Sequence, residues 1–128
     1  MKEIVQTENA PKAVGPYSQA VKAGGFLFVS GQLAIDPKKG EIVAMDIMEQ
    51  TRQVLENIKS ILQAAGYCLR DVVQNTVYLS SMTLFKEFNT EYAKFFSADA
   101  PARVTVAALL PLNALVEIST VAYQPIYS

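Results

Sequence analysis

Residues 46–79 have the sequence DIMEQTRQVLENIKSILQAAGYCLRDVVQNTVYL, which predicts a helix followed directly by a strand. Asp46 and Glu49 resemble a capping box and Gly66 supplies a stop, so the helix is predicted over residues 46–65. Apolar residues recur along it at helical spacing: Ile47, Val54, Ile58, Ile61, Leu62 and Ala65. Residues 72–79 then follow the two-residue period of a strand.

The flanking sequence adds strands on both sides of this unit and a second helix over residues 81–96. Further strands are predicted at residues 2–6, 20–22, 26–30, 104–109 and 115–122. The continuous apolar run over residues 26–29 suggests a strand covered on both faces. No repeat or linker interrupts the chain, so residues 1–128 are predicted to form one α+β domain. Two helices on one sheet face would leave the other face for a neighbouring subunit.

The composition restricts the chemistry available to this chain. Its 128 residues are 51% hydrophobic and only 18% charged, which is typical of a folded globular protein. A net charge of −1 provides no basic field to attract nucleic acid or an anionic membrane. The chain has no histidine and one cysteine, which removes the usual metal-ligand sets and every Ser-His or Cys-His nucleophile. We therefore expect no metal and no cofactor.

The cysteine count and the N-terminal residues indicate the compartment. Cys68 has no second cysteine with which to form an intramolecular disulfide, and this fits a reducing cytosol. Residues 1–10 are mixed and polar, unlike the apolar region of a signal peptide. No segment approaches the roughly eighteen consecutive apolar residues of a membrane span. The expectation is a soluble cytoplasmic protein without a membrane partner.

Two charged residues stand out in the apolar C-terminal segment. Arg103 and Glu117 are the only charged side chains between residues 100 and 128. A carboxylate inside a strand is costly to bury unless it is paired or its pKa is raised. One interpretation is a structural ion pair between the two residues, within the sheet or at a subunit interface. In the other, the Arg103 guanidinium binds a substrate carboxylate while Glu117 moves protons beside it.

Four further residues are candidate site members, and each also has an ordinary structural explanation. Tyr17 follows Gly15-Pro16, but a tyrosine there could equally pack against the sheet with its hydroxyl in water. Ser30 and Gly31 end a strand and offer a hydroxyl and close backbone approach, although turns use the same residues. Asn89 lies in the second predicted helix and could simply flank its apolar face.

Short motifs along nearly the whole chain occur in the order of one protein family. The sequence resembles the Rid family, also called YjgF or L-PSP endoribonuclease-like. The matching motifs include Val14-Gly15-Pro16-Tyr17-Ser18-Gln19, Val29-Ser30-Gly31-Gln32, Asn89-Thr90-Glu91-Tyr92, Pro101-Ala102-Arg103 and Val116-Glu117-Ile118. The resemblance implies a chorismate-mutase-like α+β fold that assembles as a homotrimer with clefts between its subunits.

The resemblance also implies hydrolysis of reactive enamines and imines to 2-oxo acids and ammonia. The implied substrates are 2-aminoacrylate, 2-iminopropanoate and 2-iminobutanoate. At matching positions, Arg103 would hold the substrate carboxylate and Glu117 would assist the attacking water. The implied cleft lining is Tyr17, Ser30, Gly31 and Asn89. An imine is already electrophilic, so orientation and one proton relay suffice without a metal or a covalent nucleophile.

The chain departs from the family pattern beside Arg103. Thr105 stands where many members carry a cysteine, so a thiol role is lost while substrate contacts through the backbone remain. The segment from Arg103 to Leu110-Pro111 is one residue shorter than usual, which reverses the side chains facing the cleft unless a bulge absorbs it. Two alternatives stay open: a regulatory trimer that binds small carboxylates without turnover, and a ribonuclease or translation inhibitor. The acidic balance and the lack of histidine count against the last.

Overall fold

The structure is a computed structural model that describes residues 1–126. Its longest helix, α1, spans Ile47–Ala64, as the helical periodicity predicts. The Asp46 carboxylate caps this helix by accepting a 2.9 Å hydrogen bond from the Glu49 N–H. At the other end Gly66 adopts a φ of 84°, the left-handed conformation that ends many helices. The apolar stripe of α1 packs on the sheet.

Six strands form one mixed sheet. Their bounds are β1 Glu3–Val5, β2 Ala20–Ala23, β3 Phe26–Gln32, β4 Val72–Leu79, β5 Ala102–Ala107 and β6 Val116–Tyr123. Their order in the sheet is β1-β2-β3-β6-β4-β5, and all neighbours are antiparallel except β4 and β5, which are parallel. The predicted α+β class is confirmed.

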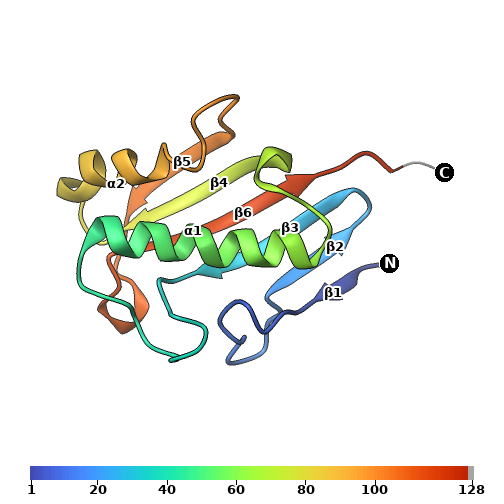
Figure 1. Ribbon diagram of the computed structural model, residues 1–128, viewed down its shortest axis with the longest axis horizontal. Coiled ribbons are helices and arrows are strands. Elements are labelled where there is room, and N and C mark those ends of the chain that lie inside the picture. The colour runs from blue at the N-terminus through green and yellow to red at the C-terminus, as the bar shows by residue number, and fades with distance from the viewer. Residues whose placement is uncertain (127–128) are drawn as a thin grey trace.

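Both helices cover the same face of this sheet (Figure 1). Helix α1 packs against β3 and β6, and the shorter α2, Phe85–Tyr92, lies beside α1. Strand side chains alternate between the two faces, and those facing the helices, such as Leu27, Leu79 and Ile118, are fully buried. These residues form the core that positions the strand ends. Neither helix in the described part of the chain has the length and apolarity needed to cross a bilayer.

The second helix is shorter than predicted. Residues 81–96 divide into a 3₁₀ turn over Met82–Leu84, helix α2, and a loose turn to Phe96. The Ser81 hydroxyl accepts a 3.2 Å hydrogen bond from the Thr83 N–H, which tightens the first turn. After Tyr92, the Lys94 and Phe95 N–H groups donate to the carbonyls of Glu91 and Tyr92, three residues back, so the chain changes from α-helical to tighter turn geometry. Two further 3₁₀ turns span Leu69–Asp71 and Pro111–Asn113.

The face of the sheet opposite the helices is uncovered by any of the described residues. This open face carries exposed apolar side chains, namely Phe26, Phe28, Val104, Val106 and Tyr123. Rings of the cluster touch one another, with centroids of Phe26 and Tyr123 4.9 Å apart. Within one chain residues 26–29 are covered on the helix face only, because Phe28 remains 47% exposed, and cover of the second face by a neighbouring subunit stays a prediction. Contiguous exposed apolar patches of this kind are typical of interaction surfaces.

Candidate functional site

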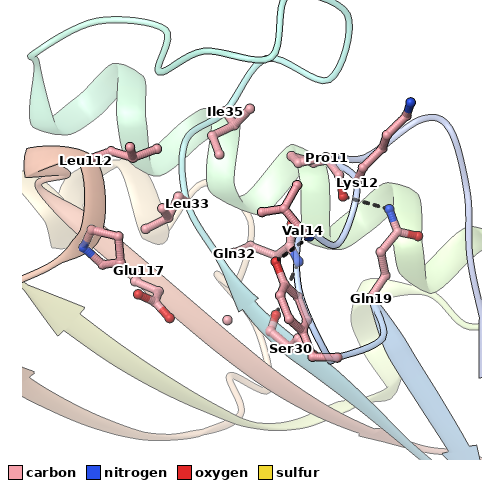
Figure 2. A pocket seen from close by; sticks show the side chains of 13 residues that line it. Pro11, Lys12, Val14, Gln19, Ser30, Gln32, Leu33, Ile35, Leu112 and Glu117 are labelled. Atoms are coloured by element: carbon pink, nitrogen blue, oxygen red, sulfur yellow. Dashed lines mark hydrogen bonds between the residues drawn. The ribbon is translucent and has the colours of Figure 1, made fainter.

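A hollow of about 580 Å³ opens where β3 leaves the sheet (Figure 2). Three loops and the strands β3 and β6 supply its wall. The lining residues are Pro11, Lys12, Val14, Tyr17, Gln19, Ser30, Gly31, Gln32, Leu33, Ile35, Pro111, Leu112 and Glu117. Four predicted site residues, Tyr17, Ser30, Gly31 and Glu117, therefore meet in one place. Among the described residues, Lys12 is the only cation that lines the hollow.

Glu117 and Gly31 lie against each other because of an irregularity in the sheet. The pairing of β3 with β6 shifts register between Val29 and Gln32, which brings the Gly31 backbone close to the Glu117 side chain. A Cβ built on Gly31 would overlap the Glu117 carboxylate, so only glycine leaves room for it. Glu117 is half-buried and finds no hydrogen-bond or ion-pair partner among residues 1–126. Burial therefore raises the pKa of this carboxyl above its ordinary value.

Two hydroxyl groups accompany this carboxylate. The Ser30 hydroxyl donates a 2.6 Å hydrogen bond to the Ser18 carbonyl, which fixes its oxygen and leaves the lone pairs available to a donor. The Tyr17 side chain is 49% exposed. Its hydroxyl oxygen receives only a long 3.4 Å contact from the Val14 N–H, so the Tyr17 O–H is free to donate. The hollow thus presents one carboxylate and two hydroxyls between apolar walls.

A buried glutamine holds the N-terminal wall of the hollow. The Gln19 Nε2 donates to the carbonyls of Pro11, Thr7 and Ala10 at 2.7, 3.0 and 3.3 Å. Its Oε1 accepts a 2.7 Å hydrogen bond from the Thr7 N–H. Gln19 is only 3% exposed, so these bonds are shielded from competing water. One side chain therefore fixes the loop that carries Tyr17.

Two amides on α1 fix the other loops around the hollow. The Asn57 Nδ2 donates to the carbonyls of Leu33 and Ile35 at 3.2 and 2.9 Å. The Gln50 Oε1 accepts a 2.9 Å hydrogen bond from the Leu115 N–H, next to the loop that carries Pro111 and Leu112. Both amides are buried. The sequence analysis did not predict these roles of Gln50 and Asn57, or that of Gln19. The available signal was their spacing, because Gln50 and Asn57 occupy positions within the apolar stripe of the helix.

Arg103 lies on the other side of the sheet from Glu117. In the parallel pair β4–β5, Arg103 is aligned with Asn75, which is buried beneath the helices. Glu117 is aligned with Tyr78, three residues further along β4, and so faces the opposite way. The interpretation of an ion pair between Arg103 and Glu117 within one chain is therefore wrong. In residues 1–126 the ion pairs are those that join Arg52 and Lys94 to Glu91.

Arg103 instead contacts aromatic rings of the second helix. Its Cζ lies 4.8 Å from the centroid of Tyr92 and 5.5 Å from those of Phe85 and Phe88. The Asn75 Nδ2 donates a 2.9 Å hydrogen bond to the Tyr92 hydroxyl oxygen. Burial raises the pKa of Tyr92, opposed by this hydrogen bond and by the Arg103 charge. The tyrosine therefore stays neutral beside the guanidinium.

The remaining predicted residues accompany Arg103 rather than the hollow. Thr105 is half-buried on β5 and shares the face of Arg103, two residues away. Asn89 is half-buried on α2, next to Phe88. The predicted site thus divides into a carboxylate group at the hollow and an arginine group at the β5 edge. Within residues 1–126 no three His, Cys, Asp or Glu side chains gather closely enough to hold a metal ion.

Comparisons with known proteins identify the family to which this chain belongs. A family model described as endoribonuclease L-PSP matches residues 7–124. A RutC family protein of Pyrococcus horikoshii is 59% identical over 97% of this chain and 99% of its own length. The chloroplastic Reactive Intermediate Deaminase A of Arabidopsis thaliana is 48% identical over 94% of this chain and 65% of its own length. The chain belongs to the Rid family.

Solved Rid structures share the fold closely. The crystal structure of Escherichia coli TdcF with bound serine superposes with a TM-score of 0.91 and 38% sequence identity. The match covers 95% of this Rid chain and 98% of TdcF. The family resemblance stated from the sequence motifs is therefore confirmed. TdcF itself holds a small amino acid.

Proposed function

We propose that this Rid protein hydrolyses reactive enamines and imines of small amino acids to 2-oxo acids and ammonia. The proposed substrates are 2-aminoacrylate, 2-iminopropanoate and 2-iminobutanoate. The observation that carries the proposal is the Glu117 carboxylate, which is half-buried, unpaired among the described residues and directed at a hollow large enough for such molecules. The name of the Arabidopsis relative supports the same class of reaction.

The proposed site is assembled from two copies of the chain. Arg103 and Glu117 lie on opposite sheet faces, so both can reach one substrate only when they come from different protomers. The exposed rings of the open face favour packing against further copies. We therefore propose a homotrimer in which the partner subunit's Arg103 approaches the hollow that contains Glu117. Thr105 and Asn89 would come to the cleft with Arg103.

The chemistry follows from these groups. Arg103 binds the carboxylate of the protonated imine and thereby fixes its C2 atom. Ionised Glu117 takes a proton from water as the water oxygen bonds to C2, which gives a carbinolamine. The same carboxyl returns this proton to the amino group, and the C–N bond breaks as ammonia leaves. The C2 hydroxyl then gives its proton to the ionised Glu117 carboxylate and becomes the carbonyl, and Glu117 passes this proton to the departing ammonia, which leaves as ammonium. 2-Aminoacrylate enters after its CH2 carbon takes a proton from solvent and becomes 2-iminopropanoate.

A trapping assay tests the proposal. Serine dehydratase generates 2-aminoacrylate in the presence of semicarbazide, and the purified protein should reduce the amount of trapped product. Arg103→Ala should lower kcat/KM roughly 100-fold, because charge-assisted hydrogen bonds to the carboxylate are lost. Glu117→Gln should lower kcat. Unchanged trapping by the wild-type protein would refute the deaminase proposal.

Matched variants separate the site from general effects of charge. Arg70→Ala and Glu56→Gln change exposed residues of the same types and should keep wild-type activity. Lys12→Ala removes the cation that lines the hollow within one chain. If Lys12→Ala abolished activity while Arg103→Ala did not, the assignment of the carboxylate to Arg103 would be wrong.

A second function is favoured by the serine bound to TdcF, namely small-molecule binding without turnover. Isothermal titration with 2-oxobutanoate distinguishes the two functions. Binding by wild-type protein without any effect in the trapping assay would support a regulatory role. Binding together with turnover supports the enzyme.

A further inference from the structure

The positive charge of Arg103 is left unneutralised by the described part of the protein. Helix α2 carries one buried carboxylate, Glu91, which is 2% exposed. That carboxylate is already shared by Arg52, at 3.3 Å, and Lys94, at 3.0 Å. Arg103 forms no ion pair with any residue between 1 and 126, although it lies against the same helix. Its charge is therefore available to an anion from outside.

Aromatic rings, and not a carboxylate, hold this arginine. The faces of Tyr92, Phe85 and Phe88 attract the guanidinium electrostatically, with Cζ 4.8 to 5.5 Å from their centroids. The ring faces offer no oxygen lone pair, and the Tyr92 hydroxyl is the only acceptor on these three side chains, so the fork keeps N–H donors for bidentate binding of a carboxylate. We call these three rings the aromatic shelf. It restrains Arg103 and leaves most of its five N–H donors to an external carboxylate.

A buried chain of hydrogen bonds fixes the shelf. The Thr120 hydroxyl donates to the Asn75 Oδ1 at 2.6 Å, and the Asn75 Nδ2 donates to the Tyr92 hydroxyl at 2.9 Å. These three residues are at most 6% exposed and come from β6, β4 and α2. The Tyr92 ring also packs between Phe88 and Phe96, with centroids 5.3 and 5.0 Å away. The ring closest to Arg103 is thus held at its edge and at both sides.

We propose that Tyr92 is a positioning residue for Arg103, and that the Thr120–Asn75–Tyr92 chain sets the orientation in which the guanidinium receives the substrate carboxylate. This inference rests on the proposed carboxylate-binding role of Arg103. Tyr92 acts through the arginine, so its loss weakens substrate binding more than it slows the chemical step. The aromatic shelf would then determine KM for carboxylate substrates, while Glu117 determines kcat.

A pair of buried tyrosines gives a matched test. Tyr67 and Tyr92 are both 6% exposed and both use their hydroxyls in buried hydrogen bonds, but Tyr67 bonds to the Gly25 carbonyl, away from Arg103. In the trapping assay, Tyr92→Leu should raise KM about tenfold with a smaller change in kcat, since a partly desolvated cation–π contact is lost. Tyr67→Leu should lower the melting temperature similarly and leave KM unchanged.

Conservative variants separate positioning from stability. Tyr92→Phe keeps the ring but breaks the Thr120–Asn75–Tyr92 chain at its hydroxyl, so its KM should lie between those of wild type and Tyr92→Leu. Phe85→Leu removes a half-buried ring of the shelf and is expected to fold well, with a KM increase of about threefold. Should Tyr92→Leu fail to fold, these two variants still measure the contribution of the shelf. A wild-type KM in Phe85→Leu and Tyr92→Phe alike would then overturn the inference.

Calorimetry with 2-oxobutanoate keeps this inference separable from the deaminase proposal. The Kd values of the variants for 2-oxobutanoate should rise in the order expected for their KM values. This order can be measured even if the protein binds without turnover. Equal Kd and KM values for wild type, Tyr92→Leu and Tyr67→Leu would overturn the role of Tyr92 and leave the deaminase proposal intact. A wild-type protein that neither turns over imines nor binds 2-oxobutanoate would overturn both.

Discussion

The Glu117 carboxylate occupies the space that any side chain at residue 31 would need. A Cβ added to Gly31 would come within 3.0 Å of the Glu117 Cδ and overlap its carboxylate oxygen. Gly31→Ala should therefore displace Glu117 and lower kcat/KM by about tenfold or more, since small misplacements of a catalytic group are costly. Kinetics in the trapping assay and thermal melting measure the two effects separately.

Gly40→Ala is the matched control for this glycine. A Cβ on Gly40 would meet no described atom within 4 Å, but its φ of 74° is unfavourable for alanine. This control should lose about 1 kcal/mol of stability and keep full activity. Equal activity in Gly31→Ala and wild type would contradict the assignment of Glu117 as the proton-transferring group.

Glu117 also predicts a pH dependence of stability. Burial raises its pKa above the ordinary 4.5, so the folded chain retains a proton over a range in which the unfolded chain has released it. The free energy of unfolding of the dissociated protomer, measured on dilute protein, should therefore fall as pH rises from 4.5 through the raised pKa, relative to Glu117→Gln, which lacks this titration. Urea denaturation of both proteins between pH 4 and 8 checks this. A difference that grows in favour of the wild type with rising pH would contradict the burial of an unpaired carboxyl.

The elements of the fold depend on amides that lie beneath the loops. Gln19→Leu removes four hydrogen bonds that tie Thr7, Ala10 and Pro11 to the start of β2. We expect a loss of about 2–4 kcal/mol, because several buried backbone groups lose their partner. KM should rise as well, since the loop that carries Tyr17 loosens. Gln63→Leu, an exposed amide on α1, should change neither stability nor KM.

Periodicity predicts elements better than it predicts which face of the sheet a residue occupies. Helix α1 and the six strands follow from local patterns, because caps, turns and apolar spacing are encoded within each segment. Alternation tells us that Arg103 and Thr105 share a face, but the direction of that face depends on the pairing of β4 with β5. The register shift near Gly31 likewise arises between β3 and β6. Residues far apart in the sequence set both features, so the opposition of Arg103 and Glu117 could not be derived from either strand alone.

In the proposed trimer, the open face of each protomer is covered by the neighbouring subunits. Phe28→Asp would place a charge among the exposed rings and should disrupt an assembly built on that face. Sedimentation should give three times the 14.0 kDa chain mass for the wild type and a lower mass for the variant. Deaminase activity should fall with dissociation, because Arg103 and Glu117 would separate. Met82→Asp, which changes an exposed apolar residue outside the open face, should stay trimeric and active.

Mixing two impaired variants tests whether Arg103 and Glu117 of one site come from different subunits. Arg103→Ala protomers retain Glu117, and Glu117→Gln protomers retain Arg103. In randomly mixed cyclic trimers made from equal amounts, roughly one cleft in four combines an intact Arg103 with an intact Glu117 from its neighbour. Co-refolding the two variants should therefore restore about a quarter of the wild-type activity, well above the residual activity of either variant alone. If both residues of each site came from one protomer, every cleft would lack one of them, and mixing would restore none.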